Sequence, residues 1–478
     1  MSNAWYYQSM QELDVACKPQ FQTLDNITYG SNLFINNPEP YCTLIDSSSA
    51  TGTYTFDSPV IESSVTDEFN EFRHKLRQLE TTMLSDLYEE SENGKFSVVD
   101  LPDIEIWKEM VKVVPKSDLK EVLIACANAV SNNDFNSAVF YITELQQLVS
   151  VFGEPIQRLG AYMLEGLVAL ISLLGSSIIC QEPANDELLS YTNILYEACP
   201  YLKFGYMSAN GAIAEAMKDE KRVHIIDFEI GQGSQWVPLI QAFAGRRGGP
   251  PYIRITVFDD STSAHIVGQR LSRLARSVNV LFEFHSVTVP VSEAGVEHFR
   301  LRPGEALAVN FAFALHRMAD ESVSTQNHRD RILRLVKSMN PKVVTLVEQE
   351  SNTNTAPFYP RFLEALDYYN AMFESMDVSL PRQHTQRINV EQHCLAKAVV
   401  NIIACEGNER VERHELLGKW KLRFLMAGFS PYPLSSVVNG TIKMLMKKYS
   451  EKYRVEERDG ALYLGWMNRD LVTCCAWK

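Results

Sequence analysis

The sequence lacks several features that mark whole classes of protein. No uninterrupted apolar run approaches the roughly 18 to 20 residues that span a bilayer. The first residues, MSNAWYYQSMQELD, hold neither the basic nor the apolar part of a secretory signal. The nine cysteines are scattered and include no C-x-x-C pair, which argues against a zinc site or a disulfide framework. We therefore expect reduced thiols inside a cell, no membrane partner and no metal.

An excess of basic charge is also missing, since the net charge is −14. Residues 1–115 contain 19 Asp and Glu against 7 Lys and Arg, whereas the rest of the chain contains 40 and 38. The acidity therefore belongs to the N-terminal quarter. The nearly neutral remainder can still carry a basic face, so the overall charge does not exclude DNA contact.

The N-terminal quarter divides into two segments. Residues 1–63 are rich in Ser, Thr, Asn, Tyr and Pro without a sustained hydrophobic period, so we predict a disordered tail. Residues 64–115 are predicted to form an acidic linker with a short amphipathic helix. A heptad-like seam runs through that helix: Phe69, Phe72, Leu76, Leu79 and Met83. The helix fits either a coiled coil or docking on the chain's own domain.

Residues 116–220 are predicted to form a leucine-rich helical cap. Ser117 is suited to N-cap its first helix, with Asp118 and Glu121 in the first turn. The apolar stripe of that helix consists of Leu119, Val122, Leu123, Cys126 and Val130. A later helix is expected to begin at Pro155 and to end at Gly175.

Residues 221–478 alternate between strands and helices. The runs VHIIDFEI, YIRITVF, LFEFHSV, ALAVNFAF and KVVTLVEQ are separated by helical patterns near 234–244, 263–276 and 327–338, which is typical of a doubly wound parallel sheet. YRVEERDGALYLGW predicts a hairpin, followed by the strand LVTCCAW. The predicted fold is α/β: a methyltransferase-like, Rossmann-type core with a largely parallel sheet and antiparallel C-terminal strands, plus the helical cap.

Five blocks occur in an order that one family shares. A leucine-rich block precedes VHIID, a second lies near 270–312, and APFYPRFLEALDYYNAMFESMD and RVERHELLGKW…CCAWK follow. From about residue 116 to its last residue the chain resembles the GRAS family of plant transcriptional regulators. YCTLIDSSS and VEQESNTNTAPF resemble its scarecrow-like branch, linked to phytochrome signalling and to chitin- and gibberellin-responsive genes. The family's PFYRE string is incomplete here, because Pro360 follows FY and two residues separate Arg361 from Glu364.

The resemblance implies where the protein acts and with what. It implies a regulator in the nucleus, and also in the cytoplasm, that binds other transcription factors or GRAS proteins, including as a homodimer. The leucine-rich helices are expected to form mostly core while leaving one groove open for a partner helix.

The segment VHIIDFEIGQGSQW has the outline of a cofactor-binding turn. In such units a strand delivers an acidic residue and glycines let the backbone approach the ligand. The candidate crevice consists of Asp227, Glu229, Gly231, Gly233 and, after the second strand, Asp259. These residues match the opening of the S-adenosylmethionine site of methyltransferases. Gln235 and Trp236 replace the third small residue, and their bulk is expected to fill the adenosine volume, so no cofactor is predicted.

His316 supports an enzymatic alternative. The stretch that begins NFAFALHRMADES resembles small-molecule O-methyltransferases, in which a histidine after the fourth strand acts as general base. A histidine in an apolar context more often makes a structural hydrogen bond. Two alternatives to a regulator therefore stay open: an S-adenosylmethionine-dependent small-molecule methyltransferase, and a non-catalytic sensor that binds a small ligand in the same crevice.

Direct DNA contact would depend on local basic residues. No helix-turn-helix, zinc finger or basic zipper is recognisable. The DNA-binding candidates are Arg246, Arg247, Lys443, Lys447 and Lys448. Tyr449 and Tyr453 interleave with the lysines, but the neighbouring glutamates equally fit a solvated helix face.

Overall fold

The computed structural model describes residues 118–172, 185–259 and 262–478. The predicted tail and linker, Ser117 and Gly175 lie outside the described residues. Asp118 is the N-cap of the first described helix, because its carboxylate accepts a hydrogen bond from the backbone N–H of Lys120 at 3.1 Å. The prediction of Ser117 as N-cap is therefore corrected by one residue.

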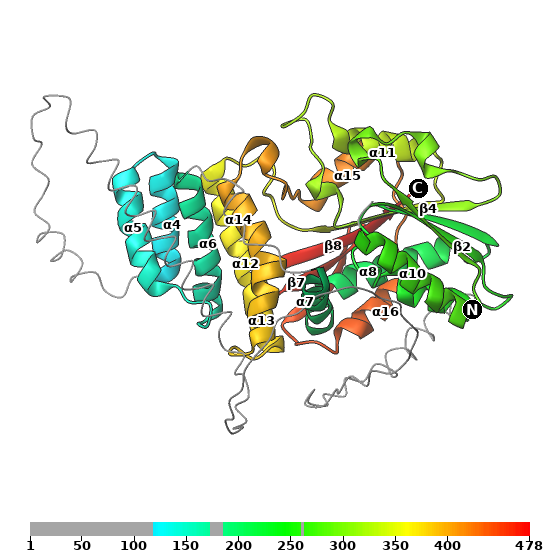
Figure 1. Cartoon of the computed structure of the whole chain (residues 1–478), viewed down its shortest axis with the longest axis horizontal. Helices are drawn as coiled ribbons and strands as arrows, with labels where there is room; N and C mark the ends of the chain where they lie inside the picture. The colour runs from blue at the N-terminus through cyan, green and yellow to red at the C-terminus, as the bar shows by residue number, and fades with distance from the viewer. Residues whose placement is uncertain (1–117, 173–184, 260–261) are drawn as a thin grey trace, which may run out of the picture. The chain divides into compact units, whose positions relative to one another are not determined.

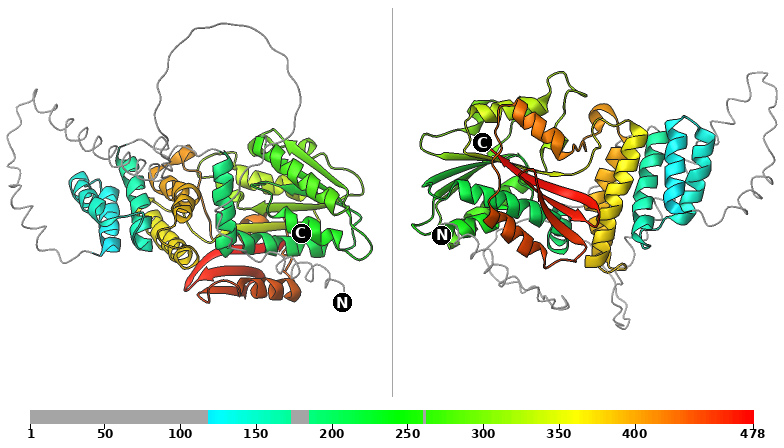
Figure 2. Two further views of the ribbon diagram at one scale, coloured as in Figure 1. Left: turned by 60° about the horizontal axis from the view of Figure 1, so that its bottom comes forward. Right: turned by 180° about the vertical axis from the view of Figure 1, so that it is seen from behind.

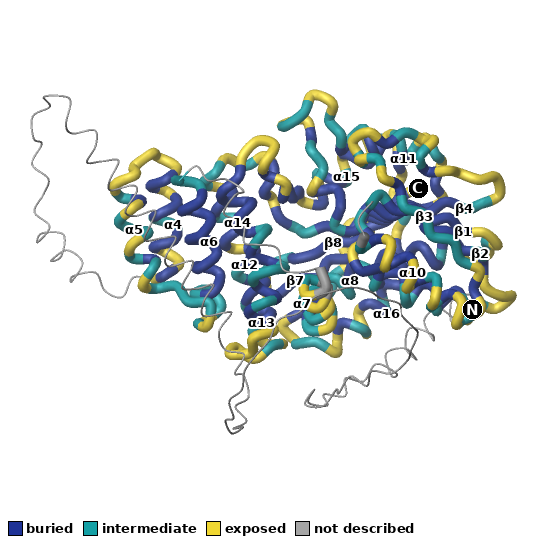
Figure 3. The backbone as a smooth tube through the Cα atoms, viewed as in Figure 1, coloured by how far each residue is buried: buried dark blue, intermediate teal, exposed yellow. Residues whose placement is uncertain are grey.

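Three helices begin the described chain: α4 (Leu119–Ser131), α5 (Phe135–Leu148) and α6 (Pro155–Ile171). The predicted apolar stripe of α4 is buried along its whole length. Burial raises the pKa of the Cys126 thiol in this stripe to about 12, so Cys126 behaves as a small apolar side chain. In Figure 3 α6 is dark blue along most of its length, which agrees with the burial of Arg158 through Ala169.

Helices from the C-terminal half complete this helical layer, which the sequence did not predict. α6 packs against α12 (Phe358–Ser379) and α14 (Lys397–Ala404). The approach is close, because a Cβ at Gly166 would lie 2.9 Å from the Cβ of Ile403. Figure 1 shows α6, α12 and α14 side by side. We call α4, α5, α6, α12 and α14 together the helical cap.

One sheet of eight strands forms the core, in the order β3-β2-β1-β4-β5-β8-β7-β6. The strands are β1 (Arg222–Asp227), β2 (Tyr252–Phe258), β3 (Phe282–Val287), β4 (Ala306–Ala312), β5 (Val343–Gln349), β6 (Tyr453–Arg458), β7 (Ala461–Trp466) and β8 (Arg469–Trp477). β1 to β5 pair in parallel and β6 to β8 pair antiparallel. Asp459 and Gly460 turn the β6–β7 hairpin with positive φ angles of 51° and 74°. The predicted fold class is confirmed.

Further helices and short helical turns complete the part of the chain that the structure describes. They are α7 (Asn185–Ala198), α8 (Pro200–Ala216), α9 (Trp236–Ala244), α10 (Thr262–Ser277), α11 (His328–Ser338), α13 (Thr385–Val390), α15 (Leu417–Met426) and α16 (Ser436–Met446), with 3-10 turns η2 (Val291–Glu293), η3 (Val296–Phe299), η4 (Leu315–Arg317) and η6 (Gly407–Glu409) and the π-helical turn η5 (Glu391–Ala396). α8 packs on β4, β5 and β8, and α10 packs on β3. The C-terminal strands, red in Figure 2, contact α12, drawn in yellow. No described helix has the length and apolar character of a membrane span.

The sheet topology fixes where a ligand crevice would lie. The strand order reverses between β1 and β4, since β2 and β3 continue on one side of β1 while β4 and β5 continue on the other. In open α/β sheets ligands bind outside the carboxyl ends of the strands at such a reversal. Asp227, the last residue of β1, lies at this point.

Candidate functional site

The carboxylate at the end of β1 is fully engaged by the protein itself. Asp227 is completely buried, and its Oδ2 accepts a hydrogen bond from Trp236 Nε1 at 2.8 Å. Its Oδ1 accepts from Asn310 Nδ2 at 3.0 Å. Burial raises the pKa of Asp227 to about 7, although the hydrogen bonds from Asn310 and Trp236 lower it. This carboxylate therefore anchors the first turn of α9 to β4.

Side-chain amides continue this network across the place between β1 and β4 where the strand order reverses, which we call the switch point. Gln235 and Asn310 exchange hydrogen bonds, at 3.2 Å from Gln235 Nε2 and at 3.1 Å from Asn310 Nδ2. Asn210 of α8 donates to the Gln235 backbone carbonyl at 2.6 Å, and Thr345 of β5 donates to Asn310 Oδ1 at 2.8 Å. These side chains are all buried. The network ties α8, α9, β4 and β5 together, and we call it the amide network.

The two glycines of the predicted crevice serve the turn itself. Gly231 and Gly233 have φ angles of +48° and +68°, which favour glycine. Gly233 N–H donates to the Ile230 carbonyl at 2.8 Å, and a Cβ at Gly233 would lie 2.6 Å from Val267 Cγ1. Glycine at position 233 is thus required by backbone conformation and by the packing of α10.

The remaining crevice candidates lie nearby. Glu229 pairs with Arg317 at 3.0 Å, and both side chains are exposed to solvent. Asp259 follows β2 directly, so Asp227 and Asp259 end neighbouring strands. The structure therefore places the predicted crevice residues at one edge of the sheet.

Part of the donor set that an S-adenosylmethionine would use is already engaged by the protein. The acidic group at the end of β1 is saturated by Trp236 and Asn310, and the indole of Trp236 is fully buried against it. The Gly233 N–H also points into the turn. Two of the groups that would recognise a cofactor, the Asp227 carboxylate and the Gly233 N–H, are thus satisfied within the protein.

His316 is paired with two carboxylates. It lies in η4, is buried, and its Nδ1 lies 2.8 Å from Glu348 Oε2. Its Nε2 lies 3.2 Å from Glu412 Oε2. Burial lowers the pKa of His316, but the charges of Glu348 and Glu412 outweigh it and raise the pKa to about 9. Because both ring nitrogens face carboxylates, this arrangement does not favour the role of general base.

The first basic candidates have different surroundings. Arg246 Nη1 donates to the backbone carbonyls of Met217, Lys218 and Glu220, at 3.3, 3.3 and 2.7 Å. Its guanidinium therefore holds the chain that leads into β1. The next residue, Arg247, is exposed.

The lysine candidates lie at the end of α16. Lys443, Lys447 and Lys448 are all exposed. The interleaved Tyr453 is buried and packs edge-on against Trp466, with ring centroids 4.8 Å apart. This tyrosine belongs to the core and does not form a stacking surface for bases.

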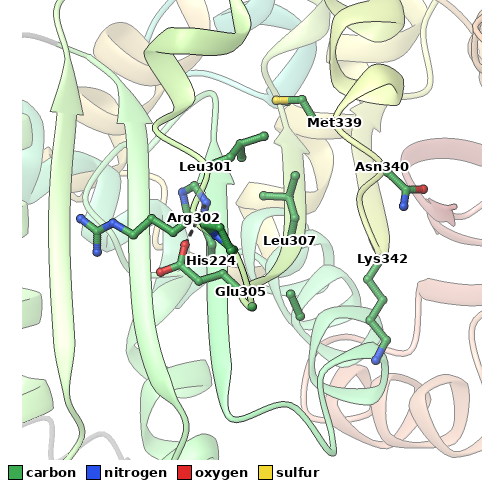
Figure 4. A pocket seen from close by; sticks show the side chains of 11 residues that line it. His224, Leu301, Arg302, Glu305, Leu307, Met339, Asn340 and Lys342 are labelled. Atoms are coloured by element: carbon green, nitrogen blue, oxygen red, sulfur yellow. Dashed lines mark ion pairs between the residues drawn. The ribbon is translucent and has the colours of Figure 1, made fainter.

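A separate cavity opens at the opposite edge of the sheet. It has a volume of about 480 Å³ and lies at the amino ends of β1 and β4, between the loop at Leu301 and Asn340. Figure 4 shows His224 and Glu305 pointing toward each other beside Arg302. Arg302 is paired with Glu283 at 2.7 Å and Lys342 with Glu220, so both cations are already neutralised by neighbours.

Comparisons with known proteins agree with this architecture. The model of the GRAS domain family matches residues 119–478. The chain is similar to the Scarecrow-like transcription factor PAT1 of Arabidopsis thaliana, at 60% identity over 495 residues that cover 99% of this chain and 100% of that protein. It is 55% identical over 437 residues to the Chitin-inducible gibberellin-responsive protein 2 of Oryza sativa subsp. japonica, covering 88% and 80%. The crystal structure of SCL7 in Oryza sativa superposes with a TM-score of 0.68 at 33% identity, covering 76% and 100%.

Proposed function

The chain belongs to the GRAS domain family and is a plant transcriptional regulator in signalling, and we propose that it works by recruiting other transcription factors or GRAS proteins in the nucleus. It would do so without methyl transfer. The observation that carries this proposal is the engagement of Asp227 by Trp236 and Asn310, because it uses one of the carboxylates that a methyl donor would need.

The amide network supports a scaffolding role for the switch point. A catalytic crevice keeps polar groups free for ligand, whereas here four elements of the sheet and its helices are joined through them. Fully satisfied buried polar networks rigidify and specify a core. The Rossmann-type shape would then act as a rigid support for surfaces that bind partners.

The helical cap offers such a surface on α5. The leucines of α6 at 159, 164 and 167 are fully buried, so they form core. By contrast, α5 buries only Ala138 and Leu145 and leaves the large apolar side chains of Phe135 and Val139 exposed at 51% and 40%. Phe135 and Val139 are four residues apart, so both lie on one face of α5. The α5 face supports recruitment of a partner, including a second copy of the chain.

Direct DNA contact is a second proposal, and it rests on Lys443 and Lys447. Because Arg246 is committed to backbone carbonyls, the exposed lysines and Arg247 are the stronger candidates. We expect Lys443→Ala/Lys447→Ala in the full chain to weaken binding to promoter and scrambled duplexes alike. The slope of the logarithm of the affinity against the logarithm of the salt concentration should fall in magnitude by about one for each lysine that neutralises a phosphate in the wild type. Fluorescence anisotropy across a salt series measures both quantities.

The matched control removes the same charge elsewhere. Lys120→Ala/Lys218→Ala replaces two exposed lysines and should leave the slope of the wild type unchanged. Equal slopes for both double variants would show that Lys443 and Lys447 do not contact DNA. No binding by the wild type at low salt would leave partner recruitment as the mechanism.

A further inference from the structure

Two histidines and two glutamates from three distant parts of the chain meet in a buried cluster. His316 lies in η4, Glu348 lies in β5, and Glu412 and His414 lie between η6 and α15. All four are buried, and the two imidazole rings stack with centroids 4.3 Å apart. We call these four residues the His–Glu cluster.

The spacing of three atoms in the His–Glu cluster matches a metal coordination sphere. Glu412 Oε2 lies 3.2 Å from His316 Nε2 and 3.2 Å from His414 Nε2. A tetrahedral zinc with bonds of about 2.1 Å separates neighbouring ligand atoms by about 3.4 Å. One nitrogen from each ring and a Glu348 oxygen also lie within 4.8 Å of one another. An ion can therefore enter with small side-chain movements.

Glu348 contacts the ring nitrogen of His316 that faces away from Glu412. In metal sites, a carboxylate in this position orients the histidine that binds the metal. Glu348 contacts His316 Nδ1 at 2.8 Å, which leaves Nε2 directed at Glu412. Its other oxygen accepts backbone N–H groups of Leu315 and His316 at 2.9 and 3.2 Å. A carboxylate on the far nitrogen fixes the ring of a metal-bound histidine and strengthens it as a ligand.

His414 has unused ligand capacity. Its Nδ1 is buried and makes no hydrogen bond within the part of the chain that the structure describes, whereas its Nε2 lies 3.2 Å from Glu412 Oε2. A buried polar atom without a hydrogen bond calls for an explanation, and a bound ion is one of the recognised explanations. His316 Nε2 and His414 Nε2 both face Glu412 Oε2, and a tilt of the His414 ring out of the stack would direct both nitrogens at one shared ion.

We propose that His316 Nε2, His414 Nε2 and Glu412 Oε2 bind one divalent transition-metal ion, with Zn²⁺ as the best match. Two imidazoles and a carboxylate suit zinc, and a water completes the tetrahedron. Binding displaces the proton between His316 and Glu412 into solvent. The ion would link η4, which follows β4, to the segment before α15. These two segments lie far apart in the sequence.

Cobalt substitution in the metal-stripped full chain tests this site. We expect one equivalent of Co²⁺ to produce the visible d–d absorption of a tetrahedral site, and Zn²⁺ to abolish it. His414→Gln and Glu412→Gln should each remove the absorption, whereas His265→Gln, at an exposed histidine of α10, should retain it. Circular dichroism of each variant identifies any that fails to fold.

A measurement on the wild type does not depend on the variants folding. X-ray absorption at the zinc edge should show only nitrogen and oxygen ligands, with the outer-shell scattering of two imidazoles. No tetrahedral cobalt spectrum in the wild type, or sulfur ligands at the zinc edge, would overturn the site. Cobalt absorption that persists in both cluster variants would overturn it as well.

Discussion

Replacing Trp236 with alanine is expected to lower the free energy of unfolding by about 3–5 kcal/mol, the range for removing a large buried aromatic side chain. Trp236 is fully buried, and its Nε1 donates to Asp227 at 2.8 Å. The substitution leaves a cavity and deprives a buried carboxylate of one donor, and both effects destabilise the native state. Urea denaturation of the full chain, read by far-UV circular dichroism, measures the change.

Trp236→Phe separates the two effects. It keeps most of the ring volume and removes only the donor, so a smaller loss of about 1–3 kcal/mol is expected. A Trp236→Ala variant that loses less than Trp236→Phe would contradict the assignment of the indole as the filler of the switch point.

Arg158→Met is expected to cost about 3–5 kcal/mol, as removal of one partner of a buried ion pair does. Arg158 is fully buried in α6, and its Nε lies 3.1 Å from Glu391 Oε1, which is equally buried in η5. Its Nη1 also lies 2.9 Å from Asp377 Oδ1 of α12. Loss of the arginine leaves Glu391 with Arg387 as its remaining ion-pair partner among the described residues. Chemical denaturation again reports the loss.

Arg382→Met is the matched control. Arg382 pairs with the same Asp377 at 2.9 Å, but its side chain is 45% exposed, so a much smaller cost than that of Arg158→Met is expected. Adding Glu391→Gln to Arg158→Met should lower the stability further, because Arg387, whose side chain is also fully buried, then loses its carboxylate partner among the described residues. Equal costs for Arg158→Met and Arg382→Met would show that burial of the pair contributes nothing.

The strands and the turn after β1 were predictable because their signals are local. Apolar runs of six or seven residues between turn residues identify a strand wherever it pairs, and each of the eight strands overlaps a predicted run. Gly231 and Gly233 have positive φ angles, as a tight turn requires. The bulk of Trp236 is likewise visible in the sequence, and its indole is fully buried.

The joining of α12 and α14 to the helical cap was not predictable from local patterns. An apolar helix face does not specify which other helix covers it, and the contacts of α6 with α12 and α14 join segments far apart in the chain. The charged residues of these helices held the strongest signal. Arg158, within the apolar run of α6, needs acidic partners, and Asp377 of α12 and Glu391 of η5 meet that need.

The amide network and the His–Glu cluster also escaped prediction, because each depends on contacts across the sheet. Asn310 and Thr345 stand as polar residues inside otherwise apolar strands, which indicates buried hydrogen bonds but not their partners. Nothing in the spacing of His316, Glu348 and Glu412 suggests that they meet. Only the register of β4 beside β5 brings the first two together.

Titration calorimetry of S-adenosylmethionine into the full chain, paired with a thermal melt, tests the central claim most directly. The claim is that the switch-point groups are satisfied within the protein, so we predict no saturable heat and no change in melting temperature. A methyl donor that binds, present at a concentration of about 100 times its dissociation constant, would instead add about 2.7 kcal/mol to the free energy of unfolding. Saturable binding with that stabilisation, abolished by Gly231→Val, would contradict the account and favour the methyltransferase.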